Sequence, residues 1–283
     1  MITPRGQVVK FFLRACAKLF AIVYVILFIE EWIMSLLFPK KNKIKLKELS
    51  GAKTYLKHLR CDIKLPSKAI VCPLSSMTKF AMSQANFKHY NCEADIYVDE
   101  KKGYCYVTGF GIGAPAMAMA LEVLIALGVK ELVLVGIAGS LQPEAVASDI
   151  VLCDGALADE GVSAHYIPQE FLKPSASLTK KLGAVLKKEK LDFHVGPTWT
   201  TDAIFRETAA EVAYYQKKNI LTVEMEASAF FAICQQKKVK AAASFVVSDE
   251  LHRLKWEPHF GEKPIFQNLH ALYHAIVKTL TGK

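Results

Sequence analysis

Three short motifs carry residue types that could bind or cleave a small polar molecule. Gly109-x-Gly111-x-Gly113 follows an expected strand and opens an expected helix, where backbone N–H groups and the helix dipole favour an anion. Glu224-Met225-Glu226 opens another helix, and an ionised carboxylate can accept hydrogen bonds from both hydroxyls of a sugar diol. Ser248-Asp249 ends an apolar strand, where poor solvation would raise the carboxyl pKa and suit a general acid.

Each motif also has a purely structural explanation when it is taken alone. The glycines could form a tight turn between a strand and a helix, and their spacing is not that of a dinucleotide fingerprint. The two glutamates could simply stabilise a helix N-terminus, and Ser248-Asp249 could cap a following element. The motifs therefore gain meaning only from their combination and order.

Short apolar runs alternate with helical patterns from residue 66 onward. Strands are expected at 69–72, 103–109, 132–135, 150–153 and 241–247, and helices at 117–127, 177–189, 225–236 and 269–280. This alternation predicts an α/β fold, a single domain over 49–283 with a mostly parallel mixed sheet flanked by helices. Ligands of such sheets bind beyond the carboxyl ends of the strands, which is where the three motifs lie.

Composition and charge exclude several classes of protein. The 283 residues are 52% hydrophobic and 22% charged, which excludes a disordered chain. The net charge of +9 belongs to residues 1–68, with 14 basic and 4 acidic residues, because the rest has 22 and 23. The body is therefore not a nucleic-acid binder. Seven scattered Cys without a CxxC pair, and His without ligand spacing, predict a reducing, cytoplasmic compartment and no metal site.

The N-terminal region, residues 1–48, is expected to form a hydrophobic and basic helix with a linker. Its apolar stretch 8–38 is interrupted by Glu30 and Glu31, contains Trp32, and is flanked by lysines. The lack of a small-x-small cleavage site argues against a signal peptide, and two carboxylates in mid-span would make a spanning helix costly. A helix lying in the membrane interface fits the length, the Trp and the lysines, and a helix packed on protein is the alternative. Membrane contact through residues 8–38 would make the protein peripheral or anchored at the inner membrane face.

The combined motif order resembles the nucleoside phosphorylase and nucleosidase superfamily, whose branch here includes uridine phosphorylase, hexameric purine nucleoside phosphorylase and methylthioadenosine nucleosidase. The resemblance covers residues 66–280, and Trp199-Thr-Thr-Asp202-Ala-Ile-Phe-Arg206-Glu207-Thr208 is similar to bacterial nucleoside phosphorylase-like proteins. The motifs that carry it are Gly109-Phe-Gly-Ile-Gly-Ala-Pro115, Gly136-Ile-Ala-Gly139, Asp159-Glu160-Gly161, Thr200-Thr-Asp-Ala203, Val223-Glu-Met-Glu226 and Val247-Ser-Asp249.

The resemblance implies roles for residues at the matching positions. Glu226 would bind the 2′- and 3′-hydroxyls of ribose, with Met225 packing on the sugar face and Glu224 beside them. Asp249 would protonate, or hydrogen-bond to, purine N7 as the glycosidic bond breaks, which favours a purine. The base pocket would be completed by Ile204, Phe205, Arg206, Glu207 and Ser248.

The phosphate site departs from the family pattern, which has arginines in the first loop and in a later strand. The first loop, 72–79, contains neither arginine nor carboxylate, and Leu134 or Val135 stands at the strand position. Ile137 replaces a threonine, and the body has only two arginines, Arg206 and Arg253. Phosphate would then be bound by Gly111, Gly113, Ser75, Ser76, Thr78 and Lys79.

The resemblance implies a pentosyltransferase that cleaves a nucleoside, purine favoured, with phosphate as co-substrate and no cofactor. Two alternatives stay open because of the phosphate-site departures. One is a nucleosidase that uses water, and the other is a catalytically silent nucleoside-binding protein tethered to a membrane. The resemblance also implies a homo-oligomer.

Overall fold

Eleven strands form one mixed sheet in the part of the chain that the computed structural model describes, residue 46 and residues 48–282. The strand order is β11-β10-β6-β8-β9-β5-β1-β4-β3-β2, and β7 pairs with β6 beside this path. The strands are β1 (Lys68–Val71), β2 (Lys88–Asn91), β3 (Asp95–Asp99), β4 (Tyr104–Thr108), β5 (Glu131–Ser140), β6 (Ile150–Asp159), β7 (Phe171–Leu172), β8 (Phe193–Thr201), β9 (Thr222–Glu224), β10 (Lys240–Glu250) and β11 (Glu257–Pro258).

Five of these strands close into a ring, because β10 pairs with both β5 and β6. From β6 the hydrogen bonds continue to β8, from β8 to β9, and from β9 back to β5. We call β5, β6, β8, β9 and β10 the closed ring. Strands in a closed arrangement have no free edge, so their ends are held in a fixed spatial relation.

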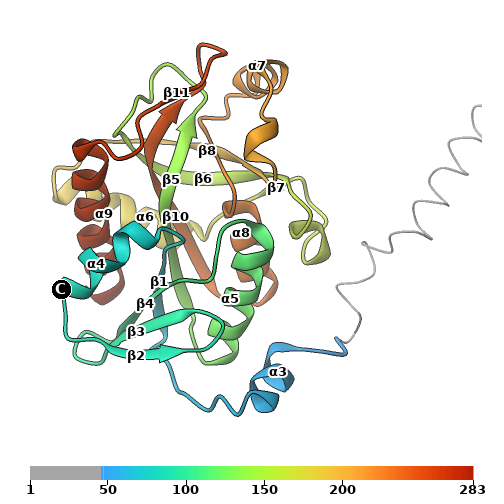
Figure 1. The fold of residues 1–283 in the computed structure, drawn as a ribbon, viewed down its shortest axis with the longest axis vertical. Helices are drawn as coiled ribbons and strands as arrows, with labels where there is room; N and C mark the ends of the chain where they lie inside the picture. Colours follow the sequence, from blue (N-terminus) through green and yellow to red (C-terminus); the bar gives the residue numbers. More distant parts are fainter. Residues whose placement is uncertain (1–45, 47, 283) are drawn as a thin grey trace, which may run out of the picture. The chain divides into compact units, whose positions relative to one another are not determined.

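Helices cover the sheet on both sides (Figure 1). In Figure 1, α5 and α8 lie on one side of β5, and α6 and α9 lie on the other. The helices are α3 (Ala52–His58), α4 (Ser75–Ser83), α5 (Ala114–Ala126), α6 (Ala176–Lys188), α7 (Ala209–Lys217), α8 (Ala227–Gln236) and α9 (Lys263–Thr281), with 3-10 turns η1 (Ser163–His165) and η2 (Ile204–Arg206).

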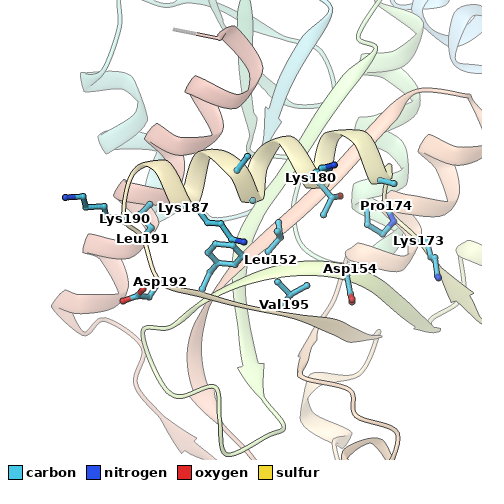
Figure 2. Close-up of a pocket in the computed structure, with 15 residues that line it drawn as sticks. Leu152, Asp154, Lys173, Pro174, Lys180, Lys187, Lys190, Leu191, Asp192 and Val195 are labelled. Atoms are coloured by element: carbon cyan, nitrogen blue, oxygen red, sulfur yellow. The ribbon is translucent and has the colours of Figure 1, made fainter.

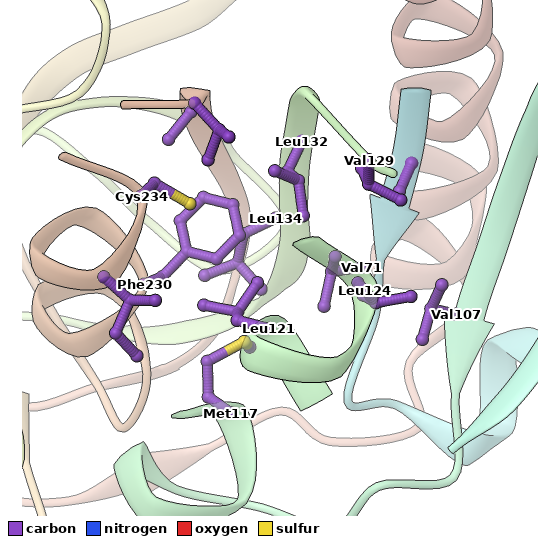
Figure 3. Close-up of a cluster of buried hydrophobic side chains, with 14 of the residues drawn as sticks. Val71, Val107, Met117, Leu121, Leu124, Val129, Leu132, Leu134, Phe230 and Cys234 are labelled. Atoms are coloured by element: carbon purple, nitrogen blue, oxygen red, sulfur yellow. The ribbon is translucent and has the colours of Figure 1, made fainter. Parts of the chain in front are cut away.

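The hydrophobic core consists mainly of two clusters on opposite sides of the central strands. Figure 3 shows the first, in which Leu121 of α5 and Phe230 of α8 face Leu134 of β5, all fully buried. The second packs α6 and α9 against the other side, with Leu182 and Ile276 fully buried. Burying one such side chain stabilises the fold by about 1.5–3 kcal/mol.

Replacing Leu121 by Ala should lower the free energy of unfolding by about 2–5 kcal/mol, because the lost methyl groups leave a cavity in a packed core. The matched control is Met119→Ala on the same helix, where the side chain is 46% exposed. That variant should change the free energy by less than about 0.5 kcal/mol. Urea unfolding of the whole chain measures both, and equal losses would contradict the assignment of this helix face to the core.

The prediction of an α/β fold with a mixed sheet and flanking helices is confirmed, but the sheet is less parallel than expected. β6 runs antiparallel to its neighbour β10, which is itself parallel to β5. A parallel neighbour needs a crossover of a dozen or more residues, whereas β6 follows β5 through the short loop 141–149. Short turns likewise make β2, β3 and β4 antiparallel.

The predicted N-terminal hydrophobic helix, including the stretch 8–38, lies outside the described residues. Among the helices of the described ranges, none combines the length and the apolar character that crossing a bilayer requires. The described residues 48–282 form one compact unit.

Candidate active site

A cavity of about 410 Å³ lies at the carboxyl ends of β5, β9 and β10. Its lining comes from segments that are far apart in the chain: residues 73–74, 112, 137–139, 204–205, 207, 223–226, 248–249, 251, 256 and 260. Glu226 and Asp249 both line this one cavity. The arrangement therefore brings together the two carboxylates that the motif order singles out.

Glu226 stands at the N-cap position of α8 and is 6% exposed. Its Oε1 accepts a hydrogen bond of 2.6 Å from the backbone N–H of Gly113, the residue that caps the N-terminus of α5. Burial raises the pKa of Glu226, while backbone N–H groups at Gly113 and Met225 oppose that rise. The positive end of α5 thus faces this carboxylate.

Glu224 lines the same cavity, but its oxygens are committed to internal hydrogen bonds. Oε2 accepts from the backbone N–H groups of Glu226 and Ala227, each at 2.7 Å, and Oε1 accepts from Thr200 Oγ1 at 2.6 Å. Burial, followed by the charge of Glu226, raises the pKa of Glu224. These bonds make Glu224 a positioning residue that fixes the turn on which Glu226 stands.

A further layer of hydrogen bonds connects this turn to the loop after β6. Thr200 Oγ1, besides donating to Glu224, accepts from the backbone N–H of Ser228 at 3.0 Å. Ser228 Oγ in turn donates to Glu160 Oε1 at 3.0 Å. Thr200 and Glu160 belong to motifs that carried the family resemblance, and the structure gives both of them a role in holding the Glu224–Glu226 turn.

Asp249 is 8% exposed and its carboxylate accepts two hydrogen bonds from side chains. Ser248 Oγ donates to Oδ1 at 2.7 Å, and Trp256 Nε1 donates to Oδ2 at 2.9 Å. Burial raises the pKa of Asp249, and these two donors limit the rise. A carboxyl group whose protonated form is favoured in this way can act as a general acid.

The backbone around Asp249 is irregular in a way that directs its side chain. The register between β10 and β5 shifts between Val247 and Asp249, so Ser248 forms a bulge. Gly139 of β5 leaves the space, since a Cβ there would lie 3.0 Å from Asp249 Oδ2 and 2.7 Å from Leu251 Cδ1. A bulge commonly re-aims a side chain beside a binding site.

Glu207 contributes a partly buried carboxyl group close to Asp249. Burial, followed by the negative charge of Asp249, raises the pKa of Glu207 to about 7. Both side chains line the cavity. This end of the cavity can therefore both donate and accept protons near neutral pH.

In the Glu207→Gln variant, the free energy of unfolding should fall less steeply with rising pH than in the unaltered protein. The folded protein holds the Glu207 proton up to about pH 7, whereas the ordinary pKa is 4.5. Between these values the folded state binds more protons than the unfolded state, so the free energy of unfolding falls as pH rises. Thermal unfolding across this range measures the slope. Exposed Glu170→Gln is the control, and an unchanged slope in Glu207→Gln would contradict the assignment.

The residues expected around a base are only partly brought together. Ile204, Phe205, Glu207 and Ser248 line the cavity, and Ser248 also orients Asp249. Arg206 is exposed and does not line it. The side chain of Phe205 is 97% exposed and stands at the rim.

The residues expected to bind phosphate do not line the cavity. Ser75, Ser76, Thr78 and Lys79 lie on α4, whose buried residues are Met77 and Ala81, so the two serines face solvent. The Gly113 N–H donates to Glu226. The cavity is lined instead by four carboxyl groups, and no lysine or arginine of the described chain lines it.

Trp256 and Phe260 line the cavity although no motif pointed to them. They follow Asp249 in a charged, irregular stretch that returns to β10 through the short strand β11. Neither apolar periodicity nor motif spacing marks such a stretch. The only signal was the position of the loop, directly after a strand that ends at the site.

No cluster of possible metal ligands occurs among the described residues.

The chain is similar to a known protein family over most of its length. The family model described as Phosphorylase superfamily matches residues 70–276. A guanosine phosphorylase of Halorubrum lacusprofundi is 34% identical over 143 residues, which are 50% of this chain and 59% of that protein. A DeoD-type purine nucleoside phosphorylase of Streptococcus pneumoniae is 32% identical over 159 residues, 55% of this chain and 67% of the relative.

A crystal structure of purine nucleoside phosphorylase from Toxoplasma gondii shares the fold, with a TM-score of 0.70 at 17% identity. That similarity covers 77% of this chain and 92% of the other. The sequence alignments are shorter, since this chain spans only about three fifths of the Halorubrum relative's length.

Proposed function

The chain belongs to the phosphorylase superfamily, and from that membership we propose that it cleaves the N-glycosidic bond of a nucleoside, purine favoured, with phosphate as acceptor. The observation that carries the proposal is that Glu226 and Asp249 line one cavity. The two sequence relatives are a guanosine phosphorylase and a purine nucleoside phosphorylase, which supports a purine as the base.

The reaction would divide the two carboxyl groups between the two parts of the substrate. As the bond between C1′ and the base nitrogen breaks, positive charge develops on the ribose and negative charge on the leaving base. Asp249 would donate its proton to a ring nitrogen of the base, and Glu226 would accept hydrogen bonds from the ribose hydroxyls. Phosphate would form the new bond to C1′, giving ribose 1-phosphate and the free base.

A second candidate function uses water as the acceptor, which would give free ribose. One observation favours it: four carboxyl groups, and no lysine or arginine of the described residues, line the cavity. A phosphate dianion gains nothing from such a lining, whereas a water molecule does not need a cationic partner.

The test is to incubate the whole chain with purine and pyrimidine nucleosides, with and without phosphate, and to identify the products by chromatography. The proposal expects base release from a purine nucleoside that depends on phosphate, together with ribose 1-phosphate. Free ribose in phosphate-free buffer would support the water-dependent reaction instead. Ligand-induced thermal stabilisation without base release would indicate a binding protein.

We also propose that the protein works as a homo-oligomer in the cytoplasm. Apolar side chains stand exposed at the rim of the cavity, among them Ile112 at 69%, Phe205 at 97% and Trp256 at 57%. A concentrated exposed apolar rim is typical of a surface that another chain covers. Sedimentation of the full chain tests the assembly. Flotation with vesicles tests membrane contact through residues 8–38.

A further inference from the structure

A second, larger cavity lies away from the candidate active site and has the form of a groove along α6. Its volume is about 980 Å³, and it shares no lining residue with the first cavity. Figure 2 shows α6 on one side and the beginning of β8, with Val195, on the other. The groove is therefore a feature that the proposed reaction does not use.

The floor of the groove is apolar and formed by closely packed elements. Leu152 of β6, Leu191 and Phe193 line it, together with Val195, which is 57% exposed. Gly183 allows α6 to approach β6, because a Cβ there would lie 3.1 Å from Leu152 Cδ2. These side chains give the groove an apolar floor between α6 and the beginning of β8.

Four lysines surround this floor, as Figure 2 shows: Lys173 near one end, Lys180 and Lys187 on α6, and Lys190 near the other end. Within the described ranges, none of the four forms an ion pair. Asp154 and Asp192 are the acidic residues of the lining. Lys180, Lys187 and Lys190 are exposed and stand along the groove.

The charge of this groove is unusual for the body of the protein. Residues 69–283 carry 22 basic and 23 acidic residues, so a cluster of unpaired lysines stands out from its surroundings. The N-terminal segment 1–45 is itself strongly basic and would be repelled. Charge complementarity calls for an occupant that is acidic and has an apolar face.

We propose that the groove along α6 binds an acidic amphipathic segment of a partner protein. The groove is open along its length and follows a helix of 13 residues, so it spans about 20 Å. Small-molecule sites enclose most of their ligand, whereas an open apolar groove of this length accepts a helix or strand of a partner. Apolar side chains of the segment lie on the floor while its carboxylates face the lysines.

The test uses a fluorescein-labelled model peptide as long as α6, with leucines on one face of a helix and glutamates on the other. Fluorescence anisotropy with the whole chain should show binding that weakens as salt is raised, because salt screens the charges. The double variant Lys180→Glu/Lys187→Glu should bind at least about tenfold more weakly, since attraction becomes repulsion. Ala184→Trp, which fills the groove without changing charge, should also abolish binding.

The matched control is Lys181→Glu/Lys188→Glu, which makes the same charge change on the same helix at positions outside the groove lining. It should change the affinity by less than about twofold. Equal weakening by both double variants would show diffuse attraction and overturn the proposal, as would equal binding of a peptide with lysines in place of glutamates. Absence of peptide binding, or binding only to phosphatidylglycerol vesicles, also overturns it. An unchanged thermal midpoint shows that each variant folds.

Discussion

Asp249→Asn should lower kcat/KM for cleavage of a purine nucleoside by about 10²-fold or more, as the loss of a general acid does. The amide has nearly the shape of the carboxyl group and keeps an oxygen that can accept from Trp256 Nε1. It cannot deliver a proton to the departing base. The change therefore removes proton donation with little change in packing, and steady-state kinetics on inosine and guanosine measures it.

The pH profile separates proton transfer from a merely structural effect. Because burial raises the pKa of Asp249, the protonated form persists to higher pH than in an ordinary Asp. Activity of the unaltered protein should fall as pH rises through that pKa, and Asp249→Asn should lack this limb. Asp154→Asn, in the separate groove, is the control and should retain the unaltered rate and profile. Near-normal turnover by Asp249→Asn would refute the assignment.

Glu226→Gln should weaken binding of a ribonucleoside by about 10- to 100-fold, because hydrogen bonds to a charged group contribute more than neutral ones. The amide oxygen can still accept from the Gly113 N–H, so the turn before α8 should keep its form. The loss should fall on KM or the dissociation constant more than on the stability of the fold. Isothermal titration or inhibition by a non-cleaved nucleoside analogue measures it.

A substrate lacking the hydroxyls tests whether Glu226 meets the sugar directly. If it does, a 2′,3′-dideoxynucleoside should bind the unaltered protein and Glu226→Gln with nearly equal affinity, since the contact is already missing. Exposed Glu170→Gln serves as the control for the loss of one negative charge. Equal weakening for both nucleosides would instead assign Glu226 a structural role.

Apolar runs predicted most of the buried strands, but they underestimated the lengths of β5, β6 and β10. The runs at 69–72 and 241–247 correspond to β1 and β10, yet β5 extends to Ser140 through the small residues after Val135. β8 was not expected as a strand, and it contains Gly196 and Pro197, two residue types that are depleted in strands. Pairing with β6 and β9 makes it a strand, which is information that a local pattern does not contain.

The site was predictable where a residue directly follows a strand, and less so elsewhere. Glu226 follows β9, and Asp249 is the last residue but one of β10. Both side chains line the cavity, while their chemical roles remain predictions. Ser75 to Lys79 were expected in a loop but begin α4, which turns its serines to solvent. Trp256 reaches Asp249 from a stretch with no local signal, because β11 folds that stretch back against β10.

The closed ring has a consequence for how this protein could acquire a preference for a different nucleoside base. Asp249, Glu224 and Thr200 all lie on strands of the closed ring. The distances between them therefore persist unless the hydrogen bonds of the closed ring break. Amide protons of β5, β8 and β10 should accordingly exchange with deuterium only through global opening, while those of 204–207 and 254–260 exchange early. In the proposed reaction, the residues assigned to catalysis therefore stand on the closed ring. Selectivity for the base is expected to depend on the loops 204–207 and 254–260, which can change in sequence without changing the ring.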